Sequence, residues 1–285
     1  MEQTLYVTDL DGTLMRNDKS ISDYTVNTIN RLIDCGLHFT YATARTIYSS
    51  AQITSGLKIN IPVITRNGTI LADHNTKELI ETVKFERETI KKLQELLGRD
   101  KTCGFVTSLQ GTQEFKTYLG DSKYSAGFQN YLDGHKDDRR LRAVRDSDEM
   151  FSGDVCYITL IDDKKELDPV YDKVKSSDEW VSVYQKDNYR SEYWLEICPK
   201  GATKAHAIKR VCELCDCNKV VVFGDSLNDI SMFEAADEAY AVENAMRELK
   251  DKATEIISSN EEDGVARWLE KKYINHFYAE STIKY

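Results

Sequence analysis

The feature that most constrains the fold is a short apolar stretch near the start of the chain that ends in two aspartates. Residues 5–8 are apolar, β-branched or aromatic, which favours a buried strand, and Asp9, Leu10, Asp11 and Gly12 follow. Strand side chains alternate with a period of two, so the two carboxylates should leave the strand end on roughly the same side. Such a pair shares a proton, or binds a divalent cation that lets both groups stay ionised.

A second apolar strand followed by acidic residues lies much later in the chain. Residues 219–223 form the clearest buried strand of the sequence, and Gly224, Asp225, Asn228 and Asp229 come after it. Gly-Asp after such a strand, with Asn and Asp at the following helix start, indicates an acidic metal-binding corner. A helix capping box explains one of these polar residues but not all of them.

Two intervening strands also end in polar residues. Thr43 and Arg45 follow a predicted strand at 37–42, and a hydroxyl and a guanidinium at that position are suited to phosphate oxygens. An N-capping threonine with a surface arginine explains the same pair without function. Asn67 follows a predicted strand at 61–65, and Asn-Gly there is typical of a plain hairpin turn. These alternatives stay open at the level of the residues alone.

The motifs resemble those of haloacid dehalogenase-like phosphotransferases. Residues 9–13 are similar to the first motif of that superfamily, Thr43 to the second and residues 224–229 to the fourth, although Ala44 stands where relatives often carry glycine. The Asn-to-Ala run at 260–266 before the last predicted helix is similar to the Cof-like branch.

The resemblance implies a role for each motif residue. Asp9 is the nucleophile, and Asp11 is the general acid and base. Mg²⁺ is bound by Asp9, the backbone carbonyl of Asp11 and Asp225, with Asp229 bound directly or through water. The residues implied to contact the phosphate or the rest of the substrate are Thr43, Arg45, Asn67 and Asn228.

A lysine at a predicted helix start supplies the remaining motif. Lys204 precedes a helix expected at 205–215, where a cation opposes the helix dipole unless it serves an anion. By resemblance Lys204 takes the third-motif role and holds the phosphoryl group against Asp9. Lys200 is the competing candidate, and the spacing of Lys204 from Gly201 favours Lys204.

The order of strands and helices predicts an α/β protein with two domains. Strand-helix-strand units imply parallel pairing, so we expect a Rossmann-like three-layer core with a parallel sheet, plus an inserted α+β cap domain. The expected core comprises residues 1–83 and 189–285, and the expected cap comprises residues 84–188. The resemblance implies that this cap acts as a lid and selects the substrate. Its charged run at 136–145 is a solvated face, or alternatively a clamp for an anionic substrate.

Composition excludes several other classes of protein. No apolar run in the 285 residues approaches the ~20 that a membrane helix needs, and a net charge of −10 disfavours binding to nucleic acid. The N-terminus lacks the basic region of a secretory signal, so we expect a cytoplasmic location. Cys212, Cys215 and Cys217 raise the alternative of a zinc site, but no nearby histidine completes a ligand set.

The resemblance therefore implies a Mg²⁺-dependent phosphatase that hydrolyses small phosphate monoesters, sugar phosphates first among them, through an aspartyl-phosphate intermediate. Its expected partner is a small phosphorylated metabolite, with no nucleic acid and no membrane. Two alternatives remain: a sugar phosphomutase that resembles phosphomannomutase, and a sugar-phosphate-binding protein without activity.

Overall fold

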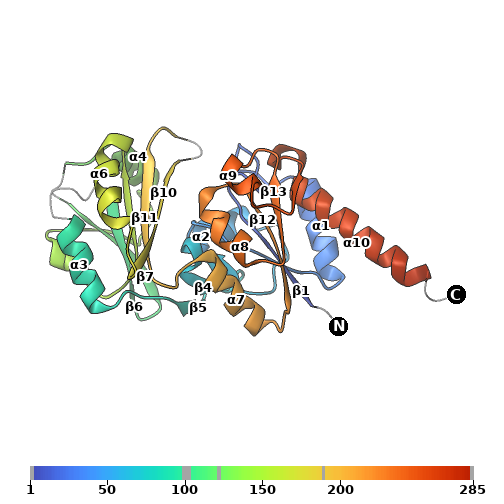
Figure 1. Ribbon diagram of the computed structural model, residues 1–285. Helices are drawn as coiled ribbons and strands as arrows, with labels where there is room; N and C mark the ends of the chain where they lie inside the picture. Colours follow the sequence, from blue (N-terminus) through green and yellow to red (C-terminus); the bar gives the residue numbers. More distant parts are fainter. Residues whose placement is uncertain (1–2, 98–103, 121–122, 188–189, 283–285) are drawn as a thin grey trace. The chain divides into compact units, whose positions relative to one another are not determined.

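The chain forms two compact units, which we call the core unit and the cap unit. The structure, a computed structural model, describes residues 3–97, 104–120, 123–187 and 190–282. The core unit comprises Met1–Ile80 and Lys204–Tyr285, and the cap unit comprises Glu81–Thr203 (Figure 1). The predicted α/β class, a core with a parallel sheet and an additional region of sheet and helices, is confirmed.

The core unit is built on a five-stranded sheet in which every pairing is parallel. Its strands, in spatial order, are β14 (Glu255–Ile257), β13 (Glu238–Val242), β12 (Lys219–Gly224), β1 (Thr4–Thr8) and β2 (His38–Tyr41). Successive residues Val221, Val222 and Phe223 of β12 are all buried, so both faces of the sheet are covered. Thr8 pairs with Phe223, which brings the carboxyl ends of β1 and β12 together.

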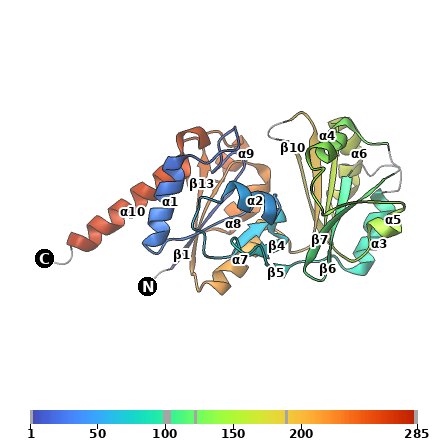
Figure 2. The same cartoon turned by 180° about the vertical axis from the view of Figure 1, so that it is seen from behind.

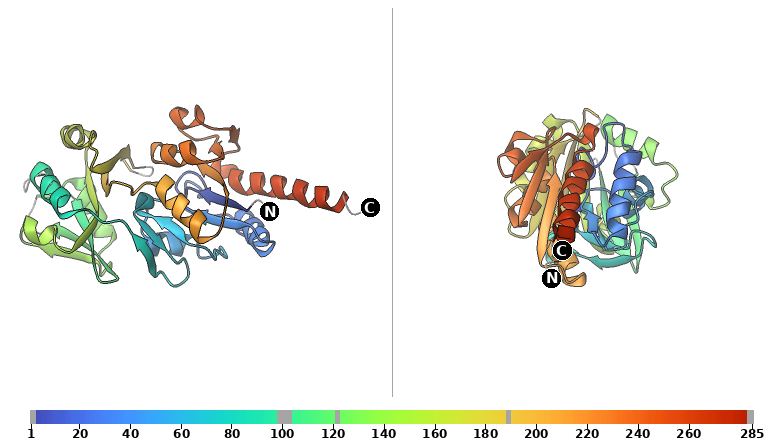
Figure 3. Two further views of the ribbon diagram at one scale, coloured as in Figure 1. Left: turned by 60° about the horizontal axis from the view of Figure 1, so that its bottom comes forward. Right: turned by 90° about the vertical axis from the view of Figure 1, so that its right-hand side faces the viewer.

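Helices pack around this sheet. They are α1 (Asp23–Asp34), α2 (Ile47–Ile53), α7 (Lys204–Leu214), α8 (Ile230–Ala235), α9 (Arg247–Lys250) and α10 (Gly264–Thr282). Helix α1 lies beside α10, as Figure 3 shows, and α7 packs on α8. Ser22 begins α1 as an N-cap whose side chain accepts a hydrogen bond from the Thr25 backbone. Helix α10 continues to Thr282, near the end of the chain.

A small second sheet of three strands, β3 (Val63–Thr65), β4 (Ile70–Ala72) and β5 (Leu79–Thr82), follows α2. The turn between β3 and β4, η1 (Arg66–Gly68), has three consecutive residues in the left-handed region, with φ of 52° at Arg66, 53° at Asn67 and 99° at Gly68. Asparagine and glycine tolerate this conformation, whereas an arginine there is strained. Such strain is typical of functional turns.

The cap unit is built on a six-stranded sheet with helices on both faces, seen from behind in Figure 2. The strands, in spatial order, are β10 (Trp180–Lys186), β11 (Tyr193–Pro199), β9 (Asp154–Asp162), β6 (Gly104–Gln110), β7 (Gln113–Leu119) and β8 (Leu141–Val144). The helices are α3 (Arg87–Leu97), α4 (Ala126–Gly134), α5 (Ser147–Met150) and α6 (Lys164–Val174). Val106 joins the apolar cluster of α3 and α6, and its neighbour Phe105 joins that of α4, as strand alternation requires.

The boundary between the units differs from the expected one. Residues 193–199 fall in the segment expected to belong to the core, but they form β11, which pairs with β9 and β10 in the cap sheet. Its residues Leu195 and Ile197 are buried in the cap cluster. The units therefore divide at 80/81 and 203/204 instead of 83/84 and 188/189, because a strand pattern does not reveal which sheet the strand joins.

The charged run at 136–145 forms part of the cap unit. Arg140 contacts Asp138 with 2.7 Å between Nε and Oδ1, and the Arg142 guanidinium lies 3.4 Å from the centre of the Phe115 ring. These contacts hold both guanidinium groups within the cap unit.

No helix in the described part of the chain is long and apolar enough to cross a membrane.

Candidate active site

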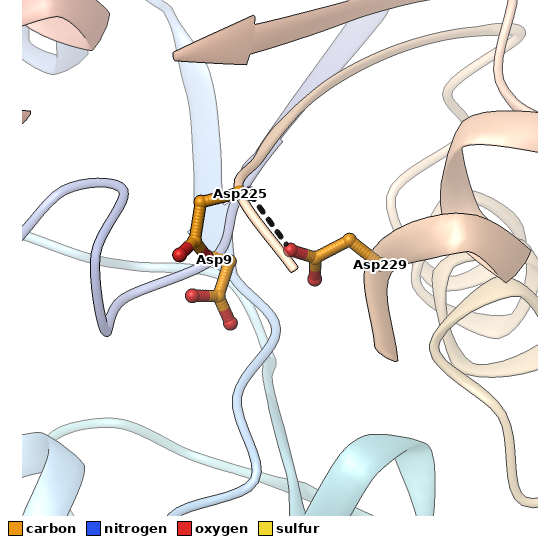
Figure 4. A group of neighbouring side chains, drawn as sticks. All are labelled: Asp9, Asp225 and Asp229. Carbon is orange, nitrogen blue, oxygen red and sulfur yellow. Dashed lines mark hydrogen bonds between the residues drawn. The ribbon is translucent and has the colours of Figure 1, made fainter. Parts of the chain in front are cut away.

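Three carboxylates meet at the carboxyl ends of β1 and β12. Asp9 follows β1 and donates its backbone N–H to the Phe223 carbonyl at 2.9 Å, and Asp225 follows β12. Asp229 lies in the short helix η3 (Leu227–Asp229). Each offers a carboxylate oxygen, and these three atoms lie within 4.8 Å of one another (Figure 4). The two acidic strand ends singled out in the sequence therefore form one cluster.

Lys204 lies among these carboxylates. It is the first residue of α7, and its Nζ is 2.6 Å from Asp9 Oδ1 and 2.6 Å from Asp229 Oδ1. The side chain is 1% exposed. Burial alone would lower the pKa of Lys204, but Asp229 and Asp9 outweigh it and raise that pKa, so the ammonium stays charged. Lys200, the competing candidate, is exposed.

Asp229 is oriented by the backbone in front of it. Its Oδ2 accepts hydrogen bonds from the backbone N–H groups of Asp225, at 3.0 Å, and Ser226, at 3.1 Å, as part of a capping box. Its other oxygen contacts Lys204. Both oxygens thus have donors already, which fits an anchor for Lys204 and for the loop that carries Asp225.

The cluster fits a divalent cation on charge and on donor type. Three carboxylates around one ammonium leave two uncompensated negative charges when all are ionised. Burial, with further repulsion from Asp229 and Asp11, raises the pKa of Asp9 to about 7 although Lys204 opposes the shift. Burial also raises the pKa of Asp225, and repulsion from Asp9 and Asp229 adds to it. A hard divalent cation prefers oxygen ligands and would offset both charges.

Asp11 points to a different partner. Arg45 binds its carboxylate with two hydrogen bonds, from Nε to Oδ2 at 2.7 Å and from Nη2 to Oδ1 at 2.5 Å. A fork of this kind fixes the direction of the carboxylate. The sequence predicted that Arg45 contacts phosphate, which stays a prediction, whereas its contacts in the structure join it to Asp11. The Asp11 side chain is not one of the three clustered carboxylates.

The predicted phosphate-contacting residues lie in neighbouring loops of the core unit. The Asn67 backbone N–H donates to the Thr43 carbonyl at 2.9 Å, and Asn228 Nδ2 donates to Asn67 Oδ1 at 3.2 Å. Thr43 and Asn67 are both buried. The structure therefore brings these three residues together.

Sequence reasoning missed two polar residues of this region. Arg66, which precedes the Asn-Gly turn, was given no role, yet it is 4% exposed beside Asn67 and has a positive φ. Thr13 was read only as part of a motif, yet its Oγ1 donates to Asp225 Oδ1 at 3.2 Å. The unusual arginine in an otherwise ordinary Asn-Gly turn was the one available signal for Arg66.

The zinc alternative, which the sequence already disfavoured, has no support in the geometry of the described residues. Among the described residues, Asp9, Asp225 and Asp229 lie close enough together to bind one metal ion. Cys212, Cys215 and Cys217 do not form such a group. Burial raises the pKa of all three thiols, which keeps them protonated. His38 Nδ1 lies 3.2 Å from Cys217 Sγ.

The core has a parallel sheet with clustered carboxylates and a buried lysine at its strand ends, and the chain has a separate cap unit. These features define the class of capped hydrolases with a Rossmann-like core. A family model described as haloacid dehalogenase-like hydrolase matches residues 6–269. The chain belongs to the haloacid dehalogenase-like hydrolases, in their Cof-like branch.

Relatives of known class point the same way. The chain is 26% identical over 288 residues to the 5-amino-6-(5-phospho-D-ribitylamino)uracil phosphatase YwtE of Bacillus subtilis, covering 92% of this chain and 96% of the relative. It is 25% identical over 275 residues to YitU of the same organism, which carries the same activity in its name, covering 94% of this chain and 97% of the relative. The protein is a phosphoric monoester hydrolase.

Solved structures share the fold. A haloacid dehalogenase-like hydrolase from Bacteroides thetaiotaomicron matches with a TM-score of 0.74 and 24% identity over 95% of this chain and 99% of the other. The subclass IIB sugar phosphatase BT4131 matches with a TM-score of 0.70 and 19% identity over 96% of this chain and 98% of the other. At these identities the match supports the fold alone.

Proposed function

We propose that this enzyme hydrolyses small phosphate monoesters in a Mg²⁺-dependent reaction through an aspartyl-phosphate on Asp9. The observation that carries the proposal is the setting of Asp9, whose buried carboxylate contacts Lys204 and lies beside the carboxylates of Asp225 and Asp229. A carboxylate held by a cation in this way is oriented for attack on phosphorus, and the cation opposes the rise in its pKa.

The proposed metal ligands are Asp9, the backbone carbonyl of Asp11 and Asp225, while Asp229 supports them through Lys204 and the loop backbone. When bound, Mg²⁺ supplies the positive charge that lets an anionic substrate approach an anionic nucleophile. Lys204 adds a fixed positive charge in contact with Asp9. Thr43, Asn67 and Asn228 provide hydroxyl and amide groups for the phosphoryl oxygens.

The proposed reaction has two steps, formation of the aspartyl-phosphate and its hydrolysis. An oxygen of Asp9 forms a bond to phosphorus as the ester P–O bond breaks, and Asp11 gives its proton to the departing alkoxide. In the second step Asp11 takes a proton from water, the water oxygen attacks phosphorus, and the bond to Asp9 breaks. Inorganic phosphate leaves and both aspartates return to their starting state.

Sugar and sugar-alcohol phosphates are the proposed substrate class. The relatives YwtE and YitU are named for a substrate with a phosphorylated ribityl chain, and one solved structure with this fold is named a sugar phosphatase. A panel of hexose, pentose and polyol phosphates, with nucleotides for comparison, would rank the class by released phosphate. A clear preference for nucleotides would contradict it.

Asp9→Asn tests the mechanism directly. The variant keeps the size of the side chain but removes the nucleophilic charge, so Mg²⁺-dependent phosphate release should fall to the level without enzyme. The matched control is Asp34→Asn, at an exposed carboxylate paired with Lys58, and it should keep normal turnover. An Asp9→Asn protein with near-normal turnover would refute the nucleophile. Conversion of a sugar phosphate to its isomer without phosphate release would favour the mutase alternative.

Cellular context forms part of the proposal. We place the enzyme in the cytoplasm with a small phosphorylated metabolite as its partner, and without nucleic acid or membrane.

A further inference from the structure

A short turn between β13 and α9 bonds to both loops that carry the acidic residues. Asn244 Nδ2 donates a hydrogen bond to the Gly12 carbonyl at 2.7 Å, next to Asp11. Two residues further on, the Met246 backbone N–H donates to the Asp225 carbonyl at 2.8 Å. This one turn therefore links the loop after β1 to the loop after β12.

The orientation of the Asn244 amide is set by a second asparagine. The backbone N–H of Asn260 donates to Asn244 Oδ1 at 3.0 Å, so the oxygen of the amide faces Asn260 and the nitrogen faces Gly12. Asn260 is buried, and its own Nδ2 donates to the Met15 carbonyl at 2.9 Å. The two asparagines thus hold the loop of residues 12–15 at two points.

The held loop lies directly against Asp225. A Cβ added to Gly12 would be 2.4 Å from Asp225 Oδ2, and Thr13 Oγ1 contacts the other oxygen of the same carboxylate. The loop and the carboxylate are already as close as a glycine allows. A shift of the Gly12 backbone by a few tenths of an ångström would therefore change where the Asp225 carboxylate lies.

We propose that Asn244 is a positioning residue, which holds the Asp11–Gly12 turn against Asp225 and so sets the alignment of the metal site. The inference rests on the proposed function, which assigns Mg²⁺ to Asp9, the Asp11 carbonyl and Asp225. Asn244 is itself exposed, so its removal takes little from the hydrophobic core, and its effect should be on geometry more than on stability.

Two variants of Asn244 separate its contacts. Asn244→Ala removes both hydrogen bonds. Asn244→Asp keeps an acceptor for the Asn260 N–H but has no donor for Gly12, and it sets a carboxylate oxygen against a carbonyl oxygen. Supporting residues around metal ligands typically change metal affinity by about 10- to 100-fold, so we expect Mg²⁺ to bind both variants at least about 10-fold more weakly.

Asn30 offers a closely matched control. Its Nδ2 donates to the Gly56 carbonyl at 2.8 Å and its Oδ1 accepts from the Lys58 N–H at 2.8 Å, the same pair of contacts at a place on α1 that takes no part in the aspartate cluster. Asn30→Ala and Asn30→Asp should bind Mg²⁺ as the unmodified protein does, within about twofold.

The measurement is calorimetric titration of metal-free protein with Mg²⁺, together with hydrogen exchange of the peptide that contains residues 10–16. Exchange in that peptide should rise in the Asn244 variants and stay unchanged in the Asn30 variants. Thermal melting of the four metal-free proteins checks that all are folded. If an Asn244 variant is unfolded, Asn244→Ser, which keeps a short polar side chain, replaces it in the comparison.

Kinetics provide an independent reading. The Mg²⁺ concentration for half-maximal phosphate release should rise about 10-fold in the Asn244 variants, and saturating Mg²⁺ should restore kcat to within about threefold. Unchanged Mg²⁺ affinity in both variants, or equal losses at Asn244 and Asn30, would overturn the inference. If the unmodified protein binds Mg²⁺ but releases no phosphate, the proposed function fails while the binding comparison still tests Asn244.

Discussion

The ammonium group of Lys204 bridges Asp9 and Asp229, with 2.6 Å to an oxygen of each. It joins the end of the first strand to the helix start after β12, two segments that are distant in sequence. A lysine at the start of a helix is unfavourable on its own, and this bridge is what offsets that cost.

Lys204→Met should remove most of the activity. The change keeps the length of the side chain but leaves two buried carboxylates without their cation, so kcat should fall by about 10³-fold and the free energy of unfolding by about 3 kcal/mol. Steady-state kinetics and chemical denaturation measure the two effects. Lys200→Met, at an exposed lysine nearby in the sequence, should match the unmodified protein. A Lys204→Met enzyme within tenfold of normal kcat would contradict the role of the bridge.

Arg45 has two candidate roles, to orient the Asp11 carboxylate through their two hydrogen bonds or to bind phosphate, and kinetics can distinguish them. If Arg45 orients Asp11 as the general acid, Arg45→Ala should lower kcat/KM for alkyl phosphates by about 100-fold. It should lower kcat/KM for p-nitrophenyl phosphate only a few-fold, because nitrophenolate leaves without a proton. If Arg45 instead binds phosphate, both substrates should suffer alike and inhibition by inorganic phosphate should weaken. Arg31→Ala, at a surface arginine paired with Glu270, serves as the control.

Much of the site could be predicted because it depends on local patterns and one general rule. Apolar strands followed by Asp9 and Asp225 are visible in the sequence, and parallel strands gather their carboxyl ends at one edge. The remainder depends on contacts between distant residues. The bond from Asn244 to Gly12 joins residues 232 apart, and no local pattern marks it. The partner of Arg45 was hidden in the same way.

The cap unit shows the same limit. Strand β7 has no clear apolar pattern in the sequence because buried charged residues interrupt it: Lys116 is 3% exposed and contacts Asp138 and the Tyr131 hydroxyl. Such charges are tolerated only because partners from distant segments surround them. Strand β11 lies in the range expected for the core but joins the cap sheet, because pairing partners are not encoded locally.

Acid should weaken the core unit through Glu238. Hydrogen bonds from Lys219 and Tyr240 lower the pKa of Glu238 from its ordinary value to about 2. A carboxylate with a lowered pKa in the folded state stabilises the protein at pH above its unfolded pKa, and this contribution is lost as pH falls toward 2. Glu238→Gln should therefore lower stability at pH 7 by about 1 kcal/mol, allowing for solvent screening. The difference in free energy of unfolding between Glu238→Gln and the unmodified protein should shrink as the pH falls from about 4.5 to 2. Chemical denaturation at a series of pH values measures it. A difference that stays constant over this range would contradict the assignment.

Gly12 is the position where the smallest change should have the largest effect. It has a φ of +80°, and a Cβ there would lie 2.4 Å from Asp225 Oδ2. Gly36, which follows α1, has a φ of +96° but no atom within 4 Å of an added Cβ. Alanine at either site carries the backbone cost of a left-handed conformation, about 1 kcal/mol, and only Gly12→Ala also displaces a proposed metal ligand. We expect both variants to lose similar backbone stability in the metal-free state, and only Gly12→Ala to lose Mg²⁺ binding and at least about 100-fold in kcat/KM. Calorimetry with Mg²⁺ and phosphate-release kinetics compare the two proteins. Equal activities of Gly12→Ala and Gly36→Ala would show that the close approach of Gly12 to the Asp225 carboxylate is not required for activity.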